Sequence, residues 1–434
     1  MFSQPSSSSR FGRQGVLRSG CRAKSAVALA VGLMLAGCAT EPVRPQIVYT
    51  GDPIIDGNAQ IAASPLQDRV MWDYRVAASA LRVGNPTEAK VKLDDAISRI
   101  GGILANDEAA RKARGYFSPE RGKTFIGEPY ERVMAYYYRG LLYWRDGELD
   151  NARACFRSAQ LIDSVAESEN YQSDYVLLDY LDGLTSAKLQ GDPADALARA
   201  EKLAKHPLPP YEPEANAMFF LEWGNGPQKY AGGSYGEQLR FRIEPSKVRS
   251  ATLRTLNKTI HFTAWDNLNY QAVTRGGRVM DFVLNNKAVF KQGADTFGDV
   301  ALVGAAVAAD NIYKDREPPR TRRRGRDEPE AKEPPQPEKN YDAENTAIAL
   351  GVVGIFSKIA SAAATPQADT RMWDNLPQYL SFGALRLPPG EHPAMLQFFD
   401  GEGHVVESLT RRLTLTIPAE QGRDTVVILS EHKR

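Results

Sequence analysis

One spacing of glycine and apolar residues occurs three times in the first half of the 434-residue chain and constrains its fold most. After each glycine, apolar side chains follow at five, nine and twelve positions. The glycines are Gly84, Gly147 and Gly191, and the residues that follow them are Ala89, Leu93 and Ala96, then Ala152, Phe156 and Ala159, then Ala196, Ala200 and Leu203. Such intervals place side chains on one face of an α-helix, and glycine commonly ends a helix. The spacing therefore predicts three helix–turn–helix pairs.

The middle copy, from Tyr136 to about residue 162, resembles the tetratricopeptide repeat. In that repeat two helices approach closely at small residues while an aromatic side chain fills the space between them, and Gly140 and Tyr143 match these positions. The copies are unevenly spaced, with 63 and then 44 residues between the turn glycines, and an insertion at roughly 101–129 separates the first two. The resemblance implies a short, divergent tetratricopeptide-like array of helical hairpins over residues 66–208.

The stretch MAYYYRGLLYWRDGELDNARACF, Met134–Phe156, is crowded with aromatic residues. A helix that is apolar around this much of its circumference is mostly buried between others, so we expect most of the rings to pack in a seam between helices. Helical repeat arrays also bind partners on a concave surface. Tyr138, Arg139 and Trp144 are the candidates to line such a partner-binding groove.

An alternation of apolar and polar residues replaces the helical pattern after the proline-rich stretch KHPLPPYEPEA. This period of two is typical of half-buried strands, and Asp400-Gly401 indicates a hairpin. The predicted strands include residues 217–223, 238–243, 394–399, 413–417 and 424–431. Short strands separated by turns predict a β-sandwich-like domain in two parts, residues 209–296 and 365–434. The expected fold class is therefore α+β and multidomain.

An insert of different composition, residues 297–364, interrupts the β-rich half. Two apolar segments rich in small residues, 297–313 and 346–364, predict a helical hairpin. The charged, proline-rich residues 314–344 between them predict a disordered loop. A membrane-inserted hairpin is the alternative, but the first segment is too short to span a bilayer and Lys358 interrupts the second.

The start of the chain combines a basic segment, an apolar run and a cysteine. Five basic residues precede the apolar run Ala26–Leu35, and the sequence LAGC, which ends at Cys38, resembles the lipobox of bacterial lipoproteins. The resemblance implies removal of residues 1–37 and attachment of acyl chains, such as palmitate, to Cys38. Ala39 after the cysteine, by similarity to enterobacterial lipoproteins, implies the periplasmic face of the outer membrane rather than the inner membrane.

The mature chain would begin with a polar stretch that contains proline and glycine, and we expect residues 38–65 to form an extended tether. Removal of the signal takes away five basic and no acidic residues, so the formal net charge of +1 becomes −4. Nucleic-acid binding normally needs a strongly basic surface. Nucleic acid is therefore not an expected partner.

No pattern typical of catalysis or metal binding stands out in the sequence. Cys155 is the one cysteine that remains after Cys38, and we expect it to be a buried thiol. The five histidines are scattered, without the spacing of a zinc site. Asp179 and Asp182 follow helical spacing, so we expect them to form a solvated acidic face. The sequence therefore predicts a protein that is not an enzyme and that uses no cofactor or metal.

Three motifs, GEPYERVMAYYYRGLLYW, WGNGPQKY and ADTRMWDNLP, together with the lipobox, resemble a family of uncharacterised bacterial lipoproteins with tetratricopeptide-like repeats. The resemblance implies no established activity. In the last motif, Asp369, Arg371 and Trp373 are candidates for a binding constellation. The alternative is that Trp373 fills the interior of the sandwich while Asp369 pairs with Arg371.

The leading functional hypothesis is a lipid-anchored periplasmic scaffold that binds a cell-envelope protein through its helical repeats. By analogy of architecture alone, that partner would belong to the peptidoglycan-synthesis machinery. The alternative is a module that binds glycan or lipid through the Asp369–Trp373 region, and an enzyme is the third possibility.

Overall fold

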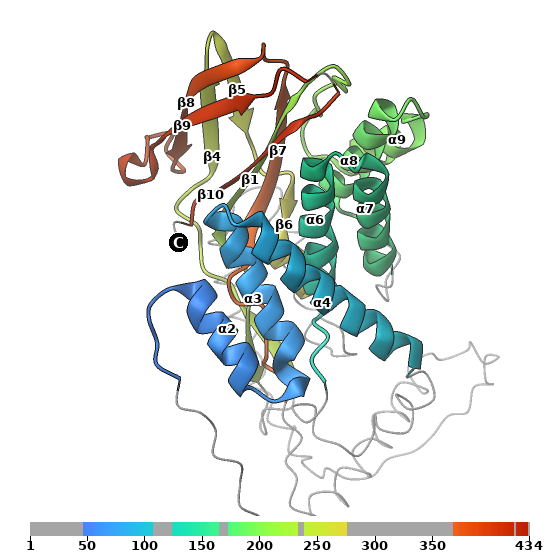
Figure 1. Cartoon of the computed structure of the whole chain (residues 1–434), viewed down its shortest axis with the longest axis vertical. Coiled ribbons are helices and arrows are strands. Elements are labelled where there is room, and N and C mark those ends of the chain that lie inside the picture. Colours follow the sequence, from blue (N-terminus) through green and yellow to red (C-terminus); the bar gives the residue numbers. More distant parts are fainter. Residues whose placement is uncertain are drawn as a thin grey trace, which may run out of the picture. The chain divides into compact units, whose positions relative to one another are not determined.

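The computed structural model describes residues 47–106, 124–164, 172–232, 238–275, 368–420 and 422–432. Three sequence predictions lie outside these residues: the signal segment with its lipid-attachment cysteine, residues 107–123 of the expected insertion, and the insert 297–364. No helix in the described ranges is long and apolar enough to cross a membrane. The described chain is α+β, as predicted, with helix pairs in its first half and β-sheets in its second (Figure 1).

The helices of the first half form antiparallel pairs, which confirms the predicted helix–turn–helix units. The pairs are α3 (Arg69–Arg82) with α4 (Pro86–Asn106), α6 (Pro129–Asp146) with α7 (Leu149–Asp163), and α8 (Val176–Lys188) with α9 (Ala194–Leu203). Gly84 and Gly147 adopt the left-handed conformation at the first two turns, with φ of +74° and +87°. In the third pair Gln190 has this conformation, with φ of +63°, because this turn holds one residue more before Gly191.

Gly140 allows α6 and α7 to approach closely. A Cβ atom at this position would lie 2.7 Å from the Phe156 ring of α7, and that ring is fully buried. The apolar residues predicted to face the partner helix in the first two pairs are all buried, and they are Ala89, Leu93, Ala96, Ala152, Phe156 and Ala159. The contact between paired helices is therefore built as the glycine spacing predicts.

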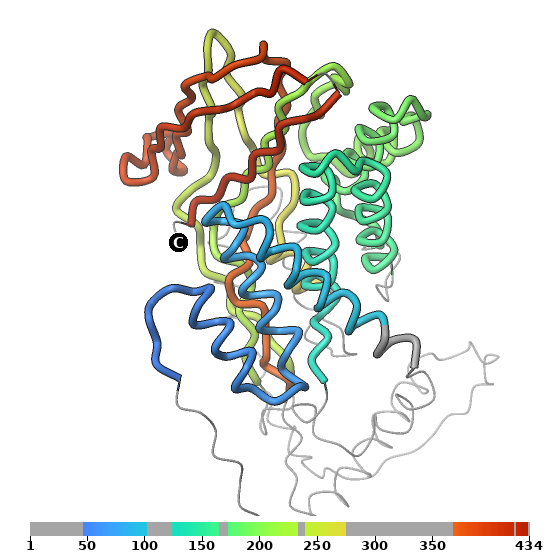
Figure 2. The backbone as a smooth tube through the Cα atoms, viewed as in Figure 1, coloured from blue at the N-terminus to red at the C-terminus, as the bar shows by residue number. Residues whose placement is uncertain are grey.

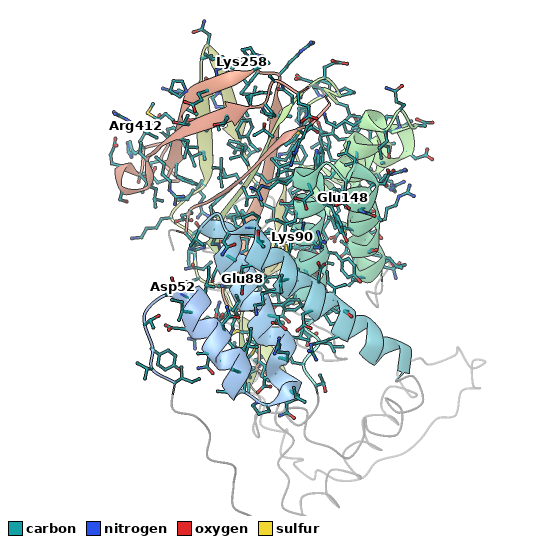
Figure 3. The ribbon with its side chains drawn as sticks, viewed as in Figure 1. Asp52, Glu88, Lys90, Glu148, Lys258 and Arg412 are labelled. Atoms are coloured by element: carbon teal, nitrogen blue, oxygen red, sulfur yellow. The ribbon has the colours of Figure 1, made fainter. Side chains whose placement is uncertain are left out.

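The predicted tether is wrong over residues 53–63, which form helix α2 (Pro53–Ala63) and pack on α3. The Asp52 carboxylate accepts hydrogen bonds from the backbone N–H groups of Ile54 and Ile55 at 2.8 and 3.2 Å. Figure 3 labels Asp52 at this end of the helix. Aspartate at the N-cap followed by proline in the first turn is a helix-start pattern. It is easily mistaken for an extended chain interrupted by proline.

The described strands form two four-stranded sheets and one two-stranded sheet. The first sheet has the order β10 (Thr425–Ser430), β1 (Ala217–Asn225), β7 (Pro377–Leu385) and β6 (Asp266–Asn267). The second has the order β5 (Lys258–Phe262), β4 (Ser250–Thr255), β8 (Gly390–Phe399) and β9 (Arg411–Ile417). The two-stranded sheet consists of β2 (Gln228–Gly232) and β3 (Gln238–Arg242), and the short helix α10 (Leu268–Arg275) follows β6.

Strand β1 pairs in parallel with β10, the last strand of the chain, and antiparallel with β7. Figure 2 shows the two ends of the β-rich half running side by side at this point. Strands β8 and β9 pair in antiparallel fashion, as the Asp400-Gly401 turn predicts. Their connection is longer than a tight hairpin, since it includes a 3-10 turn at Glu407–Leu409.

The first sheet lies between two hydrophobic cores, so β1 is buried on both faces. Phe219, Leu221 and Trp223 share a core with the second sheet, whereas Met218 and Phe220 share a core with the helices. The first sheet is therefore a middle layer, with helices on one face and the second sheet on the other (Figure 1). This arrangement confirms the β-sandwich-like fold and gives the helices and the sheet a common core.

Gly140→Ala should destabilise the protein because the added methyl group meets the Phe156 ring. We expect the free energy of unfolding to fall by about 1–3 kcal/mol, the usual cost of overpacking a core. Urea unfolding would measure the change.

Gly101→Ala on α4 is the matched control, since an added Cβ there meets no atom within 4 Å. This control should gain about 0.5–1 kcal/mol, because alanine is the better helix former. An equal effect of the two substitutions would contradict the close packing of α6 on α7.

Candidate binding site on the second and third helix pairs

The three side chains predicted to line a partner groove are buried, and they are Tyr138, Arg139 and Trp144. The Tyr138 hydroxyl donates a hydrogen bond to Glu222 of β1, and Trp144 Nε1 donates to Asp424 at 2.7 Å. Arg139 pairs with an aspartate of α4 at 2.6 Å. These side chains join α6 to the sheet and to the first helix pair. Their predicted role in partner binding is therefore wrong, and the packing interpretation of the aromatic stretch is confirmed.

The predicted constellation of Asp369, Arg371 and Trp373 belongs to the interior. Arg371 pairs with Asp369 at 2.6 Å and with Asp68 at 2.8 Å, which confirms the expected pair. Trp373 has no exposed surface and stacks on Tyr74 of α3, with ring centroids 4.3 Å apart. Its predicted place inside the sandwich is wrong, because the rings around it come from helices. The Arg371 guanidinium already pairs with two carboxylates and the Trp373 indole is covered. These residues therefore offer no surface to a glycan or lipid.

The segment that contains these residues, 368–376, fastens the β-rich half to helix α3. The Met372 carbonyl accepts a hydrogen bond from Arg75 Nη2 at 3.1 Å, and Asp374 pairs with the same guanidinium at 2.9 Å. Asn375 Nδ2 donates to the Arg75 carbonyl at 3.0 Å. We call residues 368–376 the brace segment. Four of its polar side chains, Asp369, Arg371, Asp374 and Asn375, have structural partners, which accounts for most of the dense ADTRMWDNLP motif.

A different set of charged residues lies on α7, α8 and α9. Asp182 of α8 accepts hydrogen bonds from Nε of Arg153 and of Arg157, both on α7, at 2.8 and 3.1 Å. Asp179 of α8 accepts a hydrogen bond from Nε of Arg199 on α9 at 2.9 Å. We call these five residues the arginine–aspartate cluster.

The carboxylates of this cluster are buried, whereas its arginines reach solvent. Both aspartate side chains are 2% exposed, and the three arginine side chains are 30%, 58% and 49% exposed. The predicted solvated acidic face is therefore wrong, because arginines from the neighbouring helices cover the carboxylates. The five residues of the cluster together carry three positive and two negative charges, a net charge of +1.

Each arginine of the cluster contacts its carboxylate through Nε. Among the described residues, the Nη groups of Arg153 and Arg157 have no hydrogen-bond partner, and one Nη of Arg199 lies 3.6 Å from Asp182. A guanidinium binds a carboxylate or a phosphate through two parallel N–H···O bonds. The buried carboxylates therefore hold each guanidinium group through its Nε, while Nη groups remain free to donate hydrogen bonds to an anionic ligand.

Two buried polar atoms of this region lack a hydrogen-bond partner within the described part of the chain, Asp179 Oδ2 and the Tyr211 hydroxyl. Burial raises the pKa of the Asp179 carboxyl, while the hydrogen bond and charge of Arg199 act against this shift. Burial also raises the pKa of Tyr211, and the charges of Asp179 and Asp182 add to the shift. Tyr211 therefore stays a neutral donor beside the buried carboxylates.

The sequence gives a weak indication of this cluster through the spacing of its charged residues. Arg153 and Arg157 are four residues apart, and Asp179 and Asp182 are three apart, so each pair lies on one face of its helix. Helices adjacent in an array of hairpins also pack side by side. Opposite charges on facing helices would have indicated interhelical pairs, but this signal is weak without the order of the helices in space.

Comparisons with family models, with curated proteins and with solved structures found no match for this chain. The family resemblance of the sequence motifs therefore stays a prediction. In the ranges that the structure describes, no group of three or more His, Cys, Asp or Glu side chains is placed to hold a metal ion. A functional proposal rests on the chemistry of the arginine–aspartate cluster itself.

Asp182→Asn should destabilise the fold, because it removes the carboxylate that Arg153 and Arg157 share. Since these arginines are partly exposed, we expect a loss of about 1–3 kcal/mol in the free energy of unfolding, less than for a fully buried pair. Urea unfolding would measure the loss. Glu391→Gln, at an exposed position on β8, is the control and should change stability by less than about 0.5 kcal/mol. Equal stabilities of the two variants would argue against the structural role of Asp182.

Proposed function

We propose that this protein is a lipid-anchored scaffold on the periplasmic face of the bacterial outer membrane and that it binds a protein of the cell envelope. The anchor is supported by the sequence that ends at Cys38, where a basic segment, an apolar run and the LAGC motif follow one another. The proposed activity is binding without turnover.

The observation that carries the proposal is the arginine–aspartate cluster on the helical hairpins. Two buried carboxylates hold three guanidinium groups that remain partly exposed. Fixed arginines lose less conformational freedom on binding than free ones, so preorganisation of this kind favours association. The partner would therefore present carboxylates, either in an acidic segment or at a chain terminus, and a protein of the peptidoglycan-synthesis machinery is one class to search.

The residues that the sequence first suggested for binding are buried, so fewer surfaces remain on which a partner could bind. Trp373 has no exposed surface and the Arg371 guanidinium pairs with two carboxylates. A glycan- or lipid-binding role for this region is therefore not part of the proposal. The exposed arginines of α7 and α9 are the surface to test.

In-cell cross-linking followed by mass spectrometry would test the proposal. We expect wild type to capture a defined envelope protein. The Arg157→Gln/Arg199→Gln variant removes both charges while its amides can still donate to the buried carboxylates, and it should capture at least about tenfold less, because loss of close charge pairs costs several kcal/mol. Cys38→Ser should also reduce capture, since the partner is expected at the membrane.

Arg145→Gln/Lys202→Gln is the matched control, because it removes two exposed charges on α6 and α9 outside the cluster. This variant should capture as much partner as wild type. Equal capture by the cluster variant and the control would sink the proposed binding surface. Capture of no envelope protein by an abundant, folded wild type would sink the scaffold itself.

A further inference from the structure

Helix α2 carries apolar residues on the face that points away from the rest of the protein. Its inner face packs on α3 through Gly57 and Ile61, both buried. The residues Ile55, Ala59 and Ala62 follow at intervals of four and three, which places them on one side of the helix. Leu66 lies in the 3-10 turn Leu66–Asp68, just after the helix ends. Ile55 is 56% exposed and Leu66 is 80% exposed. Apolar side chains on both faces of a surface helix indicate a second contact.

The chain just before α2 adds two more exposed apolar side chains, Val48 at 83% and Tyr49 at 67%. This stretch is fixed against the helix, since the Tyr49 hydroxyl accepts a hydrogen bond from Gln60 Nε2 at 2.6 Å. Thr50 donates to the Asp56 carboxylate through its backbone N–H at 2.7 Å. Four of the seven large apolar side chains exposed in the described residues fall in this short region. The exposed surface is therefore concentrated and ordered, rather than scattered.

The position of the lipid-attachment motif points to what covers this surface. Cys38 precedes Val48 by ten residues, and a fully extended chain spans at most ~3.6 Å per residue, or about 36 Å for this stretch. Acyl chains on Cys38 would therefore keep α2 close to the bilayer. Helix α2 also has no lysine or arginine, so its attraction to a bilayer would come from apolar burial rather than from anionic headgroups.

We propose that the apolar outer face of α2, with Val48, Tyr49, Ile55 and Leu66, lies in the interfacial region of the membrane. This second contact would orient the protein on its anchor, and it rests on the proposed function because it requires acylation of Cys38. In Figure 1, α2 and α9 lie at opposite ends of the helical region. The arginine–aspartate cluster would then face away from the bilayer, where a periplasmic partner can reach it.

Photo-crosslinking in cell membranes would test the contact in the full-length protein. A benzoylphenylalanine placed at Leu66 should cross-link to phospholipid. The same probe at Leu161 of α7, a residue that is 70% exposed, should not. A cross-link from Leu66 to protein alone, or none at all, would overturn the proposal. So would equal lipid cross-linking from both positions.

Labelling with an alkyne fatty acid separates this inference from the proposed anchor. Label on wild type and none on Cys38→Ser would establish the anchor, and a missing lipid cross-link at Leu66 would then overturn the α2 contact alone. Absence of label on wild type would overturn the anchor and the α2 contact together.

Vesicle flotation gives a second readout. The chain from residue 39 onward, which lacks both the apolar signal run and Cys38, should bind weakly to vesicles of phosphatidylethanolamine and phosphatidylglycerol. Adding Ile55→Asp/Leu66→Asp should weaken this binding about tenfold, with little effect of salt, whereas adding Val91→Asp/Leu161→Asp should leave it unchanged. Equal flotation of the two variants, or loss of binding at high salt, would contradict an apolar contact through α2.

Discussion

The carboxylate of Glu131 is fully buried, and three parts of the fold depend on it. It accepts hydrogen bonds from Lys229 Nζ of β2, from the backbone N–H of Trp373 in the brace segment, and from the backbone N–H of Glu128 at the start of α6. A buried carboxylate is costly unless its oxygens are paired, so the helix, the strand and the brace segment must be in place together. Glu222 of β1 has a similar role, since it pairs with an arginine of α3 and accepts a hydrogen bond from a tyrosine of α6.

These internal ion pairs decide which surfaces remain for function. The aromatic residues of α6 and the polar residues of the brace segment contact the sheet and the first helix pair, so they are occupied by the fold itself. The arginine–aspartate cluster differs because only its carboxylates are buried, while its guanidinium groups reach solvent. The outer face of α2 differs because its apolar side chains have no cover in the described chain. We propose the first as the surface for an acidic protein segment and the second as the contact with the bilayer.

Local patterns in the sequence predicted the helix pairs, several strands and the Asp369–Arg371 pair, because each depends on residues close together in the chain. Strands β2, β4, β5, β6 and β7 were missed, and α2 was mistaken for a tether. The larger errors concern whether a side chain is buried or exposed. Trp144 and Trp373 look the same in sequence whether they line a groove or fill a core. The contacts that decide between these roles come from residues far away in the chain, such as Asp424 for Trp144 and Tyr74 for Trp373. Asp182 has the spacing of a solvated face, and arginines on the neighbouring helix are what bury it.

Guanidinium groups held by buried carboxylates are the surface that we propose for an acidic partner. Fluorescence anisotropy with a labelled oligoglutamate peptide, and an oligolysine peptide as control, would measure this binding on the purified full-length protein. We expect saturable binding of oligoglutamate alone, which weakens as salt is added and disappears when Arg157 and Arg199 are replaced by glutamine. Undiminished binding by this variant, or no binding of oligoglutamate by the wild-type protein at low salt, would show that these guanidinium groups are not the binding surface.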